Sequence, residues 1–168
     1  MFENRYTVTK EMYKEYVNKV ICRNIYIYST VVLVLALIET FINLYNKDYS
    51  MITLNLVVFV ICLFAMILTP KIALSNLMEV DKKLHSGTRP ETVVTFNEKI
   101  VLTEGEQTIK IDYSQIQSYI RMKNSSVLMF AKQNGIMFVE NNFINGNKEE
   151  FEKFILEKCN HVREIIER

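Results

Sequence analysis

The chain has 168 residues, and its 20 lysine and arginine residues against 19 acidic ones give a formal net charge of +1. This length suits one domain with a core of its own but is short for two, and the small net charge argues against a nucleic-acid-binding protein. Hydrophobic residues make up 49 % of the chain, with four glycines and two prolines, which excludes collagen-like and disordered chains.

Charged residues are distributed unevenly along the chain. Residues 25–68 contain three of them, whereas the 79 residues from position 90 onward contain 22. The apolar region holds two stretches, residues 25–44 and 51–68, and each would reach roughly 27 to 30 Å as a helix, the thickness of a bilayer core. Because residues 56–68 lack any polar stripe, a membrane hairpin is favoured over two buried helices of a soluble protein.

The charges that flank the two spans predict their orientation. The loop at residues 45–50 contains a single basic residue, Lys47, whereas both outer flanks are rich in them. By the positive-inside rule, we expect a multi-pass protein of the cell membrane with both termini in the cytoplasm. The flanking basic residues are Arg5, Lys10, Lys14, Lys19 and Arg23 before the first span, and Lys71, Lys82, Lys83 and Arg89 after the second.

The segments beside the spans have weaker patterns. Within residues 1–24, positions 5–9 alternate like a strand, and Thr9 can cap a helix that either lies at the membrane interface or extends the first span. Residues 69–89 predict a break or kink at Pro70, then a juxtamembrane helix and a linker.

Residues 90–168 change to a strand pattern and then to a helical one. A helix is expected from the N-cap Asn147, with Glu150 completing a capping box and an apolar face reaching Ile166. The expected fold is therefore α+β, an antiparallel six- to seven-stranded barrel like that of pleckstrin-homology (PH) domains, capped by the C-terminal helix. Residues 5–9 are the candidate seventh strand. The six expected strands are residues 92–96, 99–103, 108–112, 116–122, 126–131 and 136–140.

Several short motifs resemble the YcxB-like family of bacterial membrane proteins along nearly the whole chain. The resemblance implies two transmembrane helices followed by a cytoplasmic PH-like domain, and it implies no catalytic residues. The residues that carry it are Tyr6-Thr7-Val8-Thr9 with Tyr13, Phe96-Asn97-Glu98, Tyr113-Ser114-Gln115-Ile116, and Phe143 before Glu150-Phe151.

Residues suited to catalysis or to cofactor binding are few. Neither histidine, His85 or His161, is expected to have the neighbours of a triad or a metal site, and Cys159 lies on a different helix face from His161. We therefore expect no enzyme, no cofactor and no metal. Residues 90–168 contain 10 basic residues, dispersed among 12 acidic ones, and this pattern argues against phosphoinositide binding.

One carboxylate, Glu39, falls inside the first predicted span. A carboxylate in hydrocarbon is costly unless it is protonated or paired, so Glu39 marks either a structural contact or a transport pathway. Measured from the loop, Asn55 lies at nearly the same depth in the second span. We expect a hydrogen bond between Glu39 and Asn55.

Two classes of function remain open from the sequence. The first is a non-enzymatic membrane protein that presents an interaction or regulatory domain to a protein partner, with immunity against a membrane-active toxin as one such role. The second is a transport or channel subunit that forms a homo-oligomer through the hairpin around Glu39.

Overall fold

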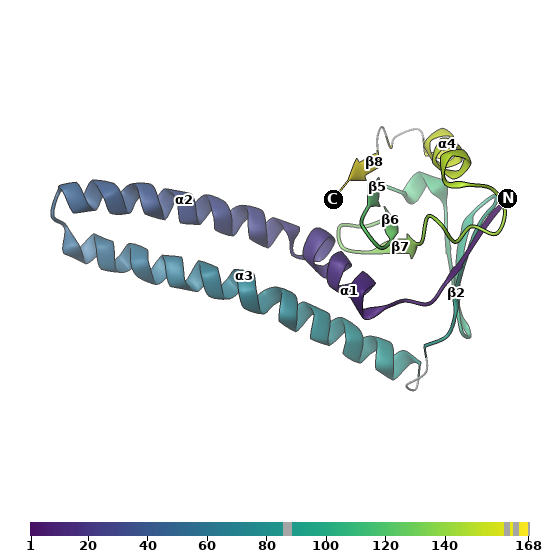
Figure 1. Ribbon diagram of the computed structural model, residues 1–168, viewed down its shortest axis with the longest axis horizontal. Coiled ribbons are helices and arrows are strands. Elements are labelled where there is room, and N and C mark those ends of the chain that lie inside the picture. Colours follow the sequence, from purple (N-terminus) through teal and green to yellow (C-terminus); the bar gives the residue numbers. More distant parts are fainter. Residues whose placement is uncertain (86–88, 160–161, 163–164, 168) are drawn as a thin grey trace. The chain divides into compact units, whose positions relative to one another are not determined.

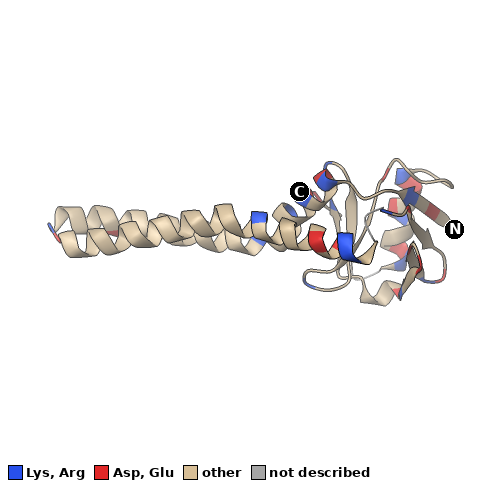
Figure 2. Cartoon of the chain, turned by 90° about the horizontal axis from the view of Figure 1, so that it is seen from below, with Lys and Arg blue, Asp and Glu red and all other residues tan. Residues whose placement is uncertain are grey.

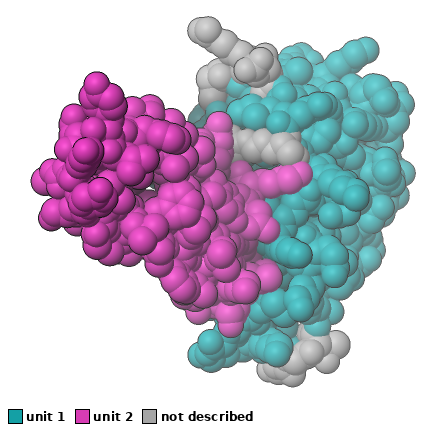
Figure 3. Space-filling model, turned by 60° about the vertical axis from the view of Figure 1, so that its left-hand side comes forward, with its two compact units in different colours: residues 1–16, 78–168 teal, residues 17–77 magenta. Residues whose placement is uncertain are grey.

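The computed structural model describes residues 1–85, 89–159, 162 and 165–167, and the chain divides into two compact units (Figure 3). Unit 1 comprises residues 1–16 and 78–168, and unit 2 comprises residues 17–77. Segments from both ends of the chain therefore share one folded unit.

Unit 2 is a helical hairpin, to which α3 contributes its residues up to Leu77 (Figure 1). A short π-helical segment, Val17–Ile21, precedes α2 (Arg23–Tyr45), and α3 (Tyr49–Leu84) follows the turn. In that turn Lys47 has a positive φ of 57°, and the Asp48 carboxylate accepts a hydrogen bond from the Met51 amide at 3.2 Å. This contact caps the first turn of α3.

Both hairpin helices are long and apolar enough to cross a bilayer. Only 6 % of each apolar window is buried, and Figure 2 shows few charged residues along either helix. Helix α3 continues through Pro70, so the helix does not break there, while the alternative, a kink at this residue, stays a prediction. Proline removes one backbone hydrogen bond, but long apolar helices tolerate this loss.

Unit 1 contains two four-stranded sheets. In the first, all neighbouring strands are antiparallel, in the order β1 (Phe2–Tyr6), β2 (Thr92–Phe96), β3 (Ile100–Glu104) and β4 (Gln107–Ile111). In the second the order is β7 (Gly135–Phe138), β6 (Ser126–Met129), β5 (Ser118–Arg121) and β8 (Ile165–Glu167), with β8 parallel to β5.

The N-terminal segment forms the extra strand expected from its alternation. Strand β1 pairs antiparallel with β2, with Phe2 opposite Phe96 and Tyr6 opposite Thr92. The strand lies at residues 2–6 rather than 5–9, because Thr9 instead caps α1 (Lys10–Tyr16), its hydroxyl accepting from the Met12 amide at 3.2 Å.

The predicted closed barrel is wrong for the described residues, because the strands form two separate sheets. The chain leaves β4 through a 3₁₀ turn, Tyr113–Gln115, and then enters β5 in the other sheet. Asp112 and Gln115 form a capping box around this turn, and Tyr113 and Ile116 are buried there. These contacts redirect the chain where a continuous barrel would need β4 and β5 to pair.

The C-terminal helix is shorter than predicted. Helix α4 (Lys148–Lys158) begins at Asn147 with the expected capping box, but its C-cap is Cys159. Ile165 and Ile166 therefore do not belong to a helix face; they pair with Tyr119 and Ile120 as β8. Both are β-branched residues, and β8 covers the edge of β5.

An aromatic cluster fills the core of unit 1. Phe151 on α4 is fully buried, with its ring 4.4 Å from Phe143, 4.6 Å from Phe96 and 5.1 Å from Phe138 between centroids. Tyr119 joins the same cluster from β5. The helix is thereby attached to both sheets.

Candidate functional site

The polar residue Asn55 lies inside the hairpin rather than on its surface. The residue is 8 % exposed, and among the described residues its Nδ2 atom has no hydrogen-bond partner. A cavity of about 270 Å³ lies beside it. The cavity is lined by Ala36, Leu37, Thr40, Ile52, Thr53, Asn55, Leu56 and Phe59.

Glu39 does not reach Asn55. It is exposed on α2, and the predicted hydrogen bond is absent from the described part of the chain. The prediction compared the depths of the two residues along the hairpin and left out rotation about the helix axis. Ala36 and Thr40, four residues apart, face the cavity, whereas Glu39 lies about 100° around the helix from Thr40. The predicted contact is therefore wrong.

A cluster of three titratable side chains lies in unit 1. Asp81 and His85 are four residues apart at the C-terminal end of α3, and Glu104 ends β3. His85 Nε2 is 3.9 Å from Asp81 Oδ1 and 3.6 Å from Glu104 Oε1. The prediction that His85 lacks such neighbours is wrong, because Glu104 is distant in sequence and no local motif joins the two.

Two further side chains hold Asp81 in place. The Tyr13 hydroxyl donates to Asp81 Oδ1 at 3.0 Å, and Arg89 Nε donates to Asp81 Oδ2 at 2.6 Å. Arg89 also donates to the Val8 carbonyl at 2.9 Å and lies over the Tyr13 ring. Burial, and to a smaller extent the hydrogen bond to Asp81, raises the pKa of Tyr13. The hydroxyl therefore stays protonated and can donate a hydrogen bond.

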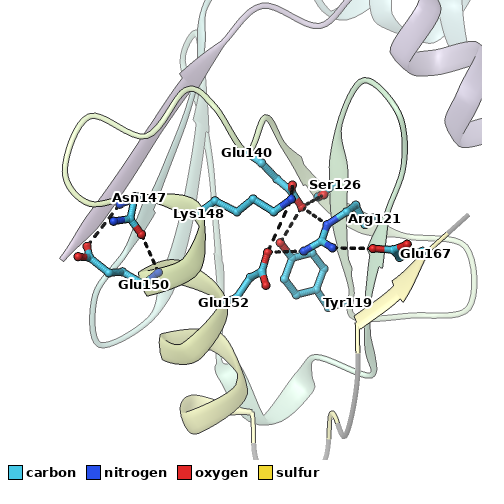
Figure 4. A network of polar contacts seen from close by, with 9 residues as sticks. All are labelled: Tyr119, Arg121, Ser126, Glu140, Asn147, Lys148, Glu150, Glu152 and Glu167. Carbon is cyan, nitrogen blue, oxygen red and sulfur yellow. Dashed lines mark hydrogen bonds and ion pairs between the residues drawn. The ribbon is translucent and has the colours of Figure 1, made fainter.

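A second polar network joins α4 to the β5–β8 sheet (Figure 4). Arg121 contacts three carboxylates: Glu140 at 2.8 Å, Glu167 at 2.8 Å, and Glu152. Lys148 reaches the second oxygen of Glu140 at 2.8 Å. Two cations, Arg121 and Lys148, thus face three carboxylates, so both cations are already paired and the network links α4 to the sheet rather than offering a free basic site.

Glu140 gives this network a pH dependence. Burial alone would raise its pKa, but hydrogen bonds from Lys148, Ser126 and Arg121 outweigh burial and lower the pKa from 4.5 to about 2. Because the pKa of this carboxylate is lower in the folded than in the unfolded state, Glu140 stabilises the fold at pH values above its pKa in the unfolded state. The contribution is lost as pH falls toward 2.

We therefore expect Glu140→Gln to reduce the free energy of unfolding at pH 7 by about 1 to 3 kcal/mol. Between pH 4.5 and about 2 the difference between variant and parent should shrink. Thermal unfolding across this pH range measures both effects, with Glu106→Gln, an exposed turn residue, as the control. A difference that stays constant with pH would contradict the assignment.

The expectation that Cys159 and His161 form no metal pair involves a residue, His161, that lies outside the described residues. Cys159 is fully buried, its Sγ lies 3.6 Å from the Tyr113 carbonyl oxygen, and burial raises the pKa of its thiol to about 11. Such a thiol is poorly reactive at neutral pH.

Comparison of the chain with protein-family models, curated proteins and solved structures finds no match.

Proposed function

We propose that the chain is a non-enzymatic, membrane-anchored interaction or regulatory protein, of the YcxB-like kind, whose PH-like domain lies at the cytoplasmic face of a bacterial membrane. The pairing of β1 with β2 carries the proposal, because the segments before and after the apolar helices belong to one folded unit. A hairpin with two spans returns both segments to the same side of a bilayer.

The exposure of the hairpin helices supports the membrane anchor. Large apolar side chains are exposed along both helices, among them Phe41, Ile61 and Phe64 at more than half of their surface. Water would disfavour so extended an apolar surface, whereas lipid would solvate it.

The electrostatics of unit 1 favour a protein partner over an anionic lipid headgroup. Arg121 contacts three carboxylates, and Lys99 pairs with Asp112 at 3.0 Å. An anionic headgroup site needs clustered cations whose charge is not already compensated.

Cysteine labelling tests the anchor and its orientation. With Cys22, Cys62 and Cys159 replaced by alanine, Lys47→Cys should react with an impermeant thiol reagent in intact cells, and Lys132→Cys only after lysis. Lys132 and Lys47 are both exposed, so accessibility is matched in the lysed sample. The reverse pattern would place the domain outside the cell and refute the proposal.

A transport or channel subunit is the second candidate, and the exposure of Glu39 favours it. A carboxylate on the outer surface of a span needs a partner, which a second copy of the hairpin would supply. Purified protein in liposomes should conduct ions, and Glu39→Gln should change that flux. Absence of flux in both, with a monomeric mass in detergent, would leave the interaction protein as the function.

A further inference from the structure

The Asp81, His85 and Glu104 cluster has an unusual geometry. The His85 side chain is 8 % exposed, and among the described residues it makes no hydrogen bond. Its Nε2 atom points between two carboxylate oxygens at 3.6 and 3.9 Å, which is too long for a hydrogen bond. A buried imidazole is thus directed at two anionic groups without bonding to either.

These separations suit atoms that share a metal ion. Nitrogen and oxygen ligands bind zinc at about 2.0 to 2.2 Å, so two ligands on one ion lie roughly 3.3 to 3.5 Å apart. Small side-chain movements would bring His85, Asp81 and Glu104 to that spacing. We propose that these three residues bind a zinc ion, which links the C-terminal end of α3 to β3.

The backbone holds the three ligands on a common side. The His85 amide donates to the Asp81 carbonyl at 3.1 Å, so His85 continues the helical turn and lies on the same face as Asp81. Glu104 lies opposite Thr92 in the sheet, and the buried Thr92 hydroxyl donates to Glu104 Oε1 at 3.3 Å. A helix and a strand therefore both contribute ligands.

The neighbouring groups act as supports of the site. Arg89 binds Oδ2 of Asp81 and leaves Oδ1, the atom nearest His85, for the ion. Tyr13 donates to that same oxygen and orients it, as hydrogen-bond donors commonly do for metal-bound carboxylates. Glu104 is partly exposed at 24 %, which provides a route of entry.

Charge and ligand type favour zinc. Two carboxylates and one guanidinium give these side chains a formal excess of one negative charge, which a divalent cation would offset. Magnesium and calcium prefer six or more oxygen ligands, whereas three ligands that include an imidazole suit zinc.

Metal titration of the full chain in mild detergent tests this site, independently of membrane topology. Protein stripped with a chelator should bind one Zn²⁺ per chain, and Zn²⁺ but not Mg²⁺ should raise its melting temperature. His85→Gln and Glu104→Gln should each weaken Zn²⁺ binding by about tenfold or more. Co²⁺ bound in place of zinc should lose its visible absorption spectrum in the same variants.

Glu79→Gln is the matched control, because Glu79 lies on the same helix but pairs with Lys83 at the surface. It should bind Zn²⁺ as the parent does. Unchanged zinc affinity in His85→Gln, or no stoichiometric binding by the parent, would overturn the proposal. So would a His85-dependent change in stability between roughly pH 5 and 7 that zinc leaves unaltered, because it would identify a protonated histidine instead.

Discussion

Replacing Phe151 by alanine should lower the free energy of unfolding of unit 1 by about 3 to 5 kcal/mol, the largest effect of a single substitution that we expect. The ring is fully buried, and three other phenylalanine rings lie within 5.1 Å of it between centroids. Its removal would leave a cavity bounded by both sheets, which cannot collapse without moving α4.

Near-UV circular dichroism during thermal or chemical unfolding in detergent measures this effect, since tyrosine side chains such as Tyr119 lie in the same cluster. Ile109→Ala on β4 is the control, because that side chain is 48 % exposed, and it should change stability by less than about 1 kcal/mol. Equal losses in the two variants would show that Phe151 is not central to the core.

Strands could be predicted from the sequence where one face of the strand is buried. In β2, Thr92, Val94 and Phe96 are buried and the residues between them are less so, which produces the alternation of period two. An N-terminal strand was expected from the alternation at residues 5–9, but its position at Phe2–Tyr6 and its register depend on the distant partner β2. The capping box at Asn147 was likewise a local signal.

Features that depend on contacts between distant parts of the chain could not be predicted from local sequence patterns. Ile165 and Ile166 fit either a helix face or a strand, and only the free edge of β5 decides between them. The pairing of Glu39 with Asn55 failed because sequence position gives depth along a hairpin but not the rotation of its helices. His85 and Glu104 meet through tertiary folding alone.

The Asn4 side chain joins the two sheets, and its loss gives the second large effect. Asn4 is fully buried on β1; its Nδ2 donates to the Val139 carbonyl at 2.7 Å, and its Oδ1 accepts from the Val139 amide at 3.0 Å. In the described residues the Val139 carbonyl has a second donor, the Asn142 amide, whereas the Val139 amide donates to Asn4.

Asn4→Leu, which keeps the size of the side chain, should therefore lower the free energy of unfolding by about 2 to 4 kcal/mol, because it removes two hydrogen bonds and leaves a buried N–H without an acceptor. The cost should appear as a lower melting temperature and as faster deuterium exchange at the amides of β1. Asn142→Ala is the matched control. The exposed Asn142 side chain donates a hydrogen bond to the Arg5 carbonyl at 3.2 Å, and its loss should lower the free energy of unfolding by less than about 1 kcal/mol. If both variants retained the parent's exchange rates in β1, the N-terminal strand would be held by its backbone pairing with β2 alone, and Asn4 would have no part in joining the sheets.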